Sequence, residues 1–130
     1  MEKTISRYSL DKVFITDGLL KIISEGQNTH LTYTDSGISE SVSYSHHPMG
    51  ALDELRNLLE NKHNSILNCN GCRVDTSHKY SGGYGTYIIQ YGKQASESVC
   101  IFDPTKEISK LGTLKEHKVA YKTWLDSLGK

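Results

Sequence analysis

The sequence predicts a single α+β domain, 1–130, in which an antiparallel sheet packs against two helices. Two observations lead to this fold class. Short β-branched and aromatic runs alternate with turn signals before residue 45 and again after residue 65, which is typical of antiparallel strands. Two longer segments, at about 48–62 and 113–128, repeat apolar residues at three- and four-residue steps, as amphipathic helices do. A chain of 130 residues has the length of one domain and can bury a core without disulfides or metal.

The N-terminal third is predicted to form a meander of four short strands. The strand candidates are residues 12–16, 19–24, 29–34 and 38–44. Turn signals separate them at Asp17-Gly18, at residues 25–28 and at residues 35–37. An Asp-Gly pair favours a two-residue hairpin turn. Strands joined by such tight turns pair as antiparallel neighbours.

The first helix is predicted to begin at Pro48, because proline suits the first helical turn. Its apolar stripe consists of Met49, Leu52, Leu55 and Leu59, with Leu58 beside them. Asp53 and Glu54 lie near its start, where the helix dipole favours negative charge. The helix is expected to end between Asn61 and Asn64.

Strand character returns after this helix. Residues 65–68 and 73–75 are predicted to pair as a hairpin across Asn70-Gly71. Residues 86–91 are β-branched and aromatic and form the best strand candidate of the chain. A turn at 92–96 and a buried strand at 99–102, closed by Pro104, are expected to follow.

The last helix carries the clearest local signal. Thr113 and Glu116 form a capping box, in which each side chain can accept a hydrogen bond from the other residue's backbone N–H. The apolar face that follows consists of Leu114, His117, Tyr121, Trp124, Leu125 and Leu128. Trp124 is predicted to anchor this helix to the sheet.

The charge balance argues against a nucleic-acid partner. Lys plus Arg and Asp plus Glu number 15 each, whereas nucleic-acid-binding domains usually carry a basic excess that neutralises phosphates. The distribution is uneven, with 6 basic and 9 acidic residues in 1–65 and 9 basic and 6 acidic residues in 66–130. The acidic half offers a surface that can attract a basic protein.

The chain is expected to be cytoplasmic and not bound to a membrane. Its first ten residues lack the apolar run of a secretory signal, and no stretch approaches the length of a membrane span. The three cysteines, an odd number, do not suggest the disulfide framework of a secreted domain.

The motifs that could hold a metal or a cofactor are incomplete. A zinc site needs about four ligands, and Cys69-x-x-Cys72 has no second pair, although His78 and Cys100 are further candidates. The glycine-rich segment 81–85 lacks the pattern of a phosphate-binding loop. We therefore predict structural thiols, no cofactor and no metal, while metal binding by these four side chains stays open.

Six histidines raise the alternative of a small RNA-cleaving enzyme with an imidazole acid–base pair. The candidates are His46, His47, His63, His78 and His117. Adjacent side chains on an extended segment point to opposite faces, so His46 and His47 are not expected to share one site. His47 is instead expected to act at the start of the helix. We predict no catalytic residue.

The C-terminal half resembles a family of small uncharacterised bacterial proteins. The resemblance rests on Leu67-x-Cys69-x-Gly71, Arg73-x-Asp75, Ser81-Gly82, Ile101-Phe102-Asp103 and a final helix that closes in Trp124-Leu125-x-Ser127-Leu128. It covers roughly residues 50–128. Gly83 departs from the family's methionine, and Cys72 adds a second cysteine. By their size and class such proteins resemble immunity proteins, which neutralise the toxins of contact-dependent and polymorphic secretion systems.

The sequence therefore predicts a cytoplasmic protein-binding module and not an enzyme, with a toxin domain as the expected partner. A housekeeping or regulatory interaction module is the alternative. The partner-binding candidates are the acidic residues Glu40, Asp53, Glu54 and Glu60 and the loop tyrosines Tyr80 and Tyr84.

Overall fold

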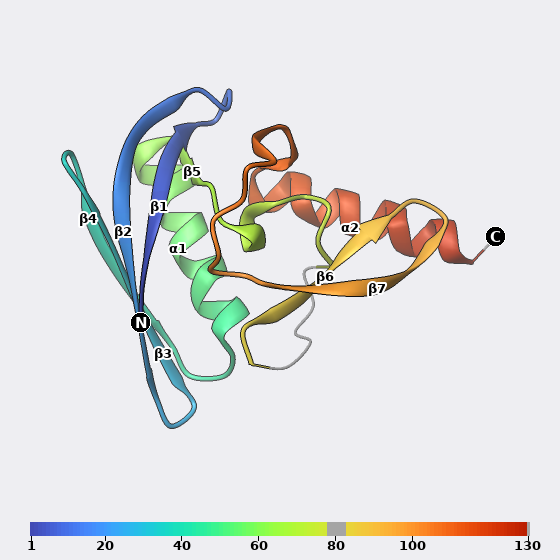
Figure 1. Ribbon diagram of the computed structural model, residues 1–130, viewed down its shortest axis with the longest axis horizontal. Coiled ribbons are helices and arrows are strands. Elements are labelled where there is room, and N and C mark those ends of the chain that lie inside the picture. The colour runs from blue at the N-terminus through green and yellow to red at the C-terminus, as the bar shows by residue number, and fades with distance from the viewer. Residues whose placement is uncertain (78–82, 130) are drawn as a thin grey trace.

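The structure is a computed structural model that describes residues 1–77 and 83–129, and it confirms an α+β fold. Within this part of the chain, the strands form one five-stranded and one two-stranded antiparallel sheet (Figure 1). The larger sheet has the order β4-β3-β2-β1-β5, with every neighbouring pair antiparallel. Its strands are β1 (Glu2–Ser9), β2 (Phe14–Glu25), β3 (Asn28–Asp35), β4 (Ser39–Tyr44) and β5 (Ser65–Leu67).

The helix α1 (Pro48–His63) covers one face of the five-stranded sheet. It begins as predicted at Pro48, where Nδ1 of the capping residue His47 accepts a hydrogen bond from the Gly50 backbone N–H at 3.0 Å. It ends at Asn64, whose φ of 47° is left-handed. The core between helix and sheet consists mainly of Ile5, Leu20, Leu31, Tyr33, Leu52, Leu55 and Leu59, all buried.

The predicted turn at Asp17-Gly18 is wrong, since β2 runs without a break from Phe14 to Glu25. Gly18 lies opposite Ile5 in the sheet, and a Cβ at this position would overlap the Tyr33 hydroxyl group. The glycine therefore makes room for the buried ring of Tyr33 and does not turn the chain. The actual turn precedes β2, at residues 10–13, and joins it to β1, a strand that the sequence did not reveal.

The predicted pairing of residues 65–68 with 73–75 is also wrong. β5 pairs instead with β1. The segment that joins β5 to residues 73–75 contains a short 3-10 helix, η1 (Asn70–Cys72). Arg73 forms an isolated bridge with Leu111, which directly follows the second 3-10 helix, η2 (Ile108–Lys110). Residues 73–75 thus join the C-terminal part of the fold.

The small sheet is the hairpin of β6 (Gly85–Gln90) and β7 (Lys93–Cys100). The strand predicted at 86–91 is confirmed, but the turn after it is shorter than the predicted 92–96. It consists of Tyr91 and Gly92, whose φ of 75° suits glycine. As a result β7 begins at Lys93 and ends before the apolar pair Ile101-Phe102, which is buried in the core.

The C-terminal helix α2 (Leu114–Leu128) starts with the predicted capping box. Oγ1 of Thr113 accepts from the Glu116 N–H, and Oε1 of Glu116 accepts from the Thr113 N–H. In Figure 1, α2 and the β6–β7 hairpin run side by side away from the five-stranded sheet. Neither α-helix in the described part of the chain has the length and apolarity that a membrane span requires.

Candidate functional site

The helix α2 leaves most of its apolar side chains accessible to solvent. Of its fifteen residues, all of which the structure describes, only His117 is fully buried. Val119 and Leu125 are exposed, and Tyr121, Trp124 and Leu128 are half-buried. An amphipathic helix in a globular domain normally buries its apolar stripe, so this helix presents surface that the rest of the domain does not cover.

Hydrogen bonds, more than burial, fix the C-terminal part of α2. Trp124 donates its indole Nε1–H to the Lys93 carbonyl at 2.8 Å, which anchors the helix to the hairpin and not to the five-stranded sheet. The Ser127 hydroxyl accepts from the Gly92 N–H at 2.8 Å and donates to the Trp124 carbonyl at 2.6 Å. The end of the helix is therefore held against the turn of the hairpin.

The hairpin contributes two further aromatic side chains beside Trp124. Tyr87 of β6 is 37% exposed, and Tyr91 of the turn is 73% exposed. The rings of Tyr121 and Trp124 are tilted at 32° with their centroids 5.9 Å apart. We call these side chains the aromatic surface; it consists of Tyr87, Tyr91, Tyr121, Trp124 and Leu125.

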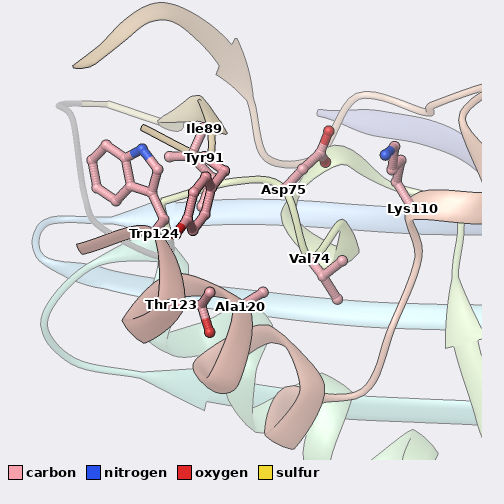
Figure 2. Close-up of a pocket in the computed structure, with 8 residues that line it drawn as sticks. All are labelled: Val74, Asp75, Ile89, Tyr91, Lys110, Ala120, Thr123 and Trp124. Carbon is pink, nitrogen blue, oxygen red and sulfur yellow. The ribbon is translucent and has the colours of Figure 1, made fainter. Parts of the chain in front are cut away.

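Two hollows flank Trp124 on this surface. The first, of about 260 Å³, lies between α2, the end of β6 and the segment around Asp75. Figure 2 shows Tyr91 and Trp124 at one end of it and Asp75 and Lys110 at the other. The second, of about 370 Å³, is lined by Tyr87, Tyr121, Trp124 and Leu125 together with Ser77, Gln94 and Ala95. Concave apolar surface beside aromatic rings suits a protruding side chain of a partner.

A row of lysines borders the aromatic surface on α2. Lys115, Lys118 and Lys122 are exposed on α2 and form no ion pair within the described residues. Their three- and four-residue spacing places them in one row, which runs beside Tyr121 and Leu125. An acidic partner would therefore be attracted to this side of the domain.

Most of the acidic residues predicted to bind a partner are engaged within the fold. Oε2 of Glu40 lies 2.6 Å from Nε2 of His63 and 3.1 Å from Nζ of Lys62, and the hydrogen bonds of His63 and then Lys62 lower the pKa of Glu40. The carboxylate of Glu60 accepts from the Leu114 N–H at 3.1 Å, at the start of α2. Burial raises the pKa of Glu60. These two carboxylates therefore hold elements of the fold together.

Asp53 and Glu54 differ in their surroundings. Oδ1 of Asp53 lies 3.9 Å from Nη1 of the buried Arg56, so this carboxylate takes part in a structural ion pair. Glu54 is exposed on α1 and lines a separate hollow with Asn57 and Lys62. Among the four acidic candidates, Glu54 is thus the one that presents its charge to solvent.

The two tyrosine candidates lie apart from the aromatic surface or outside the described residues. The ring of Tyr84 packs edge-on against Phe102 with centroids 5.2 Å apart, and its hydroxyl contacts the Ser24 hydroxyl. Tyr84 is therefore half-buried against the core. Tyr80 falls within residues 78–82, which the structure does not describe.

The cysteine motif lies in the hydrophobic core, beside the buried polar contacts of Arg56. Cys69 and Cys72 are fully buried free thiols with their sulfur atoms 3.4 Å apart. Beside them Nη1 of Arg56 donates to the Gly71 carbonyl and contacts Nδ1 of His117, each at 2.8 Å. Among the described residues, no three His, Cys, Asp or Glu side chains are grouped as a metal site requires. His78, a candidate ligand, lies outside those residues.

The histidines that the structure describes contact different elements of the fold. His30 bonds to Ser43, His47 caps α1, His63 pairs with Glu40, and His117 contacts Arg56 and Thr76. The ring of His46 packs edge-on against Tyr44. These contacts tie each of the five imidazoles to its local structure.

Comparison with family models, with curated proteins and with solved structures found no match. The site is therefore assigned from its own geometry. The helical pattern correctly predicts that Tyr121, Trp124 and Leu125 share one apolar face, but it assigns that face to packing. For Tyr87 and Tyr91 the sequence indicates only a strand.

Proposed function

We propose that this chain is a protein-binding module that uses the aromatic surface to bind its partner. The main support is that Tyr91, Trp124 and their neighbours gather at an accessible, concave surface of α2 and the hairpin. Trp and Tyr are enriched among the residues that dominate binding energy at protein interfaces, because they bury large apolar area and lose little side-chain entropy. The proposal includes no catalytic residue and no cofactor.

The charges suggest the chemistry of the partner surface. The lysine row on α2 borders the aromatic surface, while Glu40 and Glu60 are engaged inside the fold. A complementary partner would insert an apolar side chain beside Trp124 and place carboxylates opposite Lys118 and Lys122. Such rim charges mainly raise the association rate and make it depend on salt.

We further propose that the partner is a bacterial toxin domain, which would make this chain an immunity protein of the cytoplasm. This step rests on the resemblance of the C-terminal half to small bacterial proteins of that class. The Trp124-Leu125-x-Ser127-Leu128 segment that carries much of the resemblance also carries the centre of the aromatic surface. The motif behind the resemblance and the proposed contact surface thus coincide.

The proposal is tested by co-expressing the chain with the C-terminal domain of a large secreted protein encoded beside it. We expect the cells to survive and a one-to-one complex to elute from a size-exclusion column. Cells that die regardless, together with no complex on the column, would refute the toxin assignment.

The surface is tested separately in the same complex by Tyr91→Ala and Trp124→Ala. Each is expected to weaken binding by about 2 kcal/mol, roughly 30-fold in Kd, as measured by calorimetry. The matched control is Phe14→Ala, an exposed aromatic residue of β2 outside the aromatic surface, which should bind as the wild type does. If Glu54→Lys abolishes binding while Tyr91→Ala leaves it unchanged, the contact surface lies on α1 instead.

A further inference from the structure

Cys69 and Cys72 belong to one tight turn of the buried backbone. The Cys72 N–H donates to the Cys69 carbonyl at 3.0 Å, which closes the turn. Both side chains are fully buried, and their sulfur atoms approach to 3.4 Å. The two thiols therefore face each other inside the fold.

The geometry of this turn is close to that of a disulfide. The end residues of a hydrogen-bonded four-residue turn have Cα atoms less than about 7 Å apart, and disulfides span about 4.4–6.8 Å between Cα atoms. The sulfur–sulfur bond is about 2.05 Å long, so the two sulfurs need to approach by roughly 1.4 Å. Side-chain rotation with a small backbone adjustment can supply this movement.

The neighbours of Cys72 lower the pKa of its thiol. A hydrogen bond from the Cys69 thiol lowers the pKa of Cys72, burial of the side chain opposes this shift, and the positive charge of Arg56 lowers the pKa further. The same hydrogen bond, together with burial, raises the pKa of Cys69 well above its ordinary value. Thiol–disulfide exchange begins with attack by a thiolate, and Cys72 is the sulfur whose pKa its neighbours lower.

We infer that Cys69 and Cys72 form a reversible disulfide within the folded chain, in exchange with low-molecular-weight disulfides. The Cys72 thiolate attacks one sulfur of the small disulfide, and the other sulfur leaves as a thiolate that takes up a proton. Cys69 then loses its proton and displaces the second small thiol from the mixed disulfide. In total the chain gives up two electrons and two protons, and the oxidant becomes two thiols.

The Cys69–Cys72 turn is hydrogen-bonded to the segments next to α2 and β7, so a disulfide here affects how both are attached. The Cys72 carbonyl accepts from the Gly112 N–H at 3.1 Å, just before α2, and the Gly71 N–H donates to the Ile101 carbonyl at 2.9 Å, just after β7. The two thiols therefore lie where α2 and the β6–β7 hairpin are attached to the core. Because both sulfurs are buried, attack requires transient opening of this attachment, and the exchange is expected to be slow.

The test uses the full chain, equilibrated under native conditions with defined ratios of reduced to oxidised glutathione, quenched in acid and alkylated. Cleavage by trypsin places Cys69 and Cys72 together in the peptide 63–73 and Cys100 alone in the peptide 94–106. In the reduced protein, we expect the peptide 63–73 to carry two alkyl groups. In the oxidised protein, it should carry none and weigh two hydrogens less than the unmodified reduced peptide. The change should follow a single two-electron transition. The variant Cys100→Ser should show the same transition, and Cys69→Ala and Cys72→Ala should each abolish it.

Two results would overturn the inference. One is a peptide 63–73 that stays doubly alkylated at every ratio, while the urea-unfolded chain oxidises in the same buffers. The other is oxidised material in which the peptide 63–73 is linked to the peptide 94–106 or to a second chain. Circular dichroism of each cysteine variant confirms that the fold is kept, so that loss of the transition reflects loss of the thiol.

Discussion

Replacing Arg56 by alanine removes a buried cation that joins α1 to two distant segments. Nη1 of Arg56 donates to the Gly71 carbonyl and to Nδ1 of His117, each at 2.8 Å, and Nη2 donates to the Gly112 carbonyl at 3.1 Å. Because arginine can only donate, Nδ1 of His117 is the acceptor, and its Nε2–H donates to the Thr76 carbonyl at 2.9 Å. The guanidinium therefore holds the start of α2 against α1.

The expected cost follows from these contacts. Alanine leaves three buried acceptors without their donor, at about 1 kcal/mol each, and it removes the packed stem of the side chain, at about 1 kcal/mol more. The sum of about 4 kcal/mol agrees with the roughly 3–5 kcal/mol typical of breaking a buried charged pair from one side. At an unfolding entropy of about 2.1 cal/mol/K per residue, a chain of 130 residues should lose about 15 °C in Tm.

Urea unfolding followed by fluorescence measures this change, because Trp124 is the single tryptophan of the sequence. The matched control is Lys62→Ala on the same helix, where the side chain is 65% exposed in its pair with Glu40. That control should change the free energy of unfolding by less than about 0.5 kcal/mol. An Arg56→Ala variant within about 1 kcal/mol of the wild type, at an unchanged m-value, would refute the reasoning.

Three further substitutions test separate parts of the fold. Gly18→Ala should destabilise it by about 2 kcal/mol in calorimetry, because the new Cβ overlaps the buried Tyr33 ring. Asp35→Asn should reduce the loss of stability at acid pH, as measured by urea unfolding at a series of pH values. Burial alone would raise the pKa of Asp35, but hydrogen bonds from Arg7 and from the following turn lower it from 3.8 to about 2. The fold therefore favours the carboxylate, and about 2 kcal/mol of stability present above pH 4 is lost as the pH falls toward 2. Thr113→Ala should cost about 1 kcal/mol and speed amide exchange in the first turn of α2.

Each of these variants has a control of the same chemistry. A Cβ added at Gly37 would lie 3.4 Å from Nη2 of Arg7, so Gly37→Ala should leave the stability nearly unchanged. An equal loss of stability at both glycines would contradict the role given to Tyr33. Asp11→Asn, at an exposed position, should keep the full acid transition. Thr123→Ala, an exposed residue later in α2, should leave exchange in the first turn unchanged.

The parts of the fold that the sequence predicted correctly have local causes. Pro48 and the Thr113–Glu116 capping box act within one helical turn, and they mark the starts of both helices. The failures have distant causes. The Asp17-Gly18 pair predicts a turn, whereas the reason for the glycine is the ring of Tyr33, fifteen residues later. No pattern within a short window distinguishes a glycine that turns the chain from one that accommodates a neighbour.

The same distinction separates the predicted site from the observed one. The sequence predicts free surface charge at Glu60 and Glu40. In the structure, Glu60 accepts from the Leu114 N–H, 54 residues later, and Glu40 contacts His63, 23 residues later. Conversely, the stripe through Tyr121 and Trp124 predicts burial, because such a stripe on a helix normally faces a core. Whether a stripe meets a core depends on where the helix is placed, and this is decided by Arg56, Glu60 and the hairpin together.

The construction of α2 argues that its apolar stripe serves binding more than stability. A helix of fifteen residues is marginal in water by itself and normally gains its stability by burying one face. Here the helix is held by a capping box, by Glu60 at its start, and by the indole of Trp124 on the Lys93 carbonyl. With the helix fixed by hydrogen bonds at both ends, the exposed area of Tyr91, Tyr121 and Leu125 is not required to keep it in place. Aromatic surface that is rigidly positioned and left uncovered lowers the solubility of the free protein. This cost is offset only when a partner covers the surface.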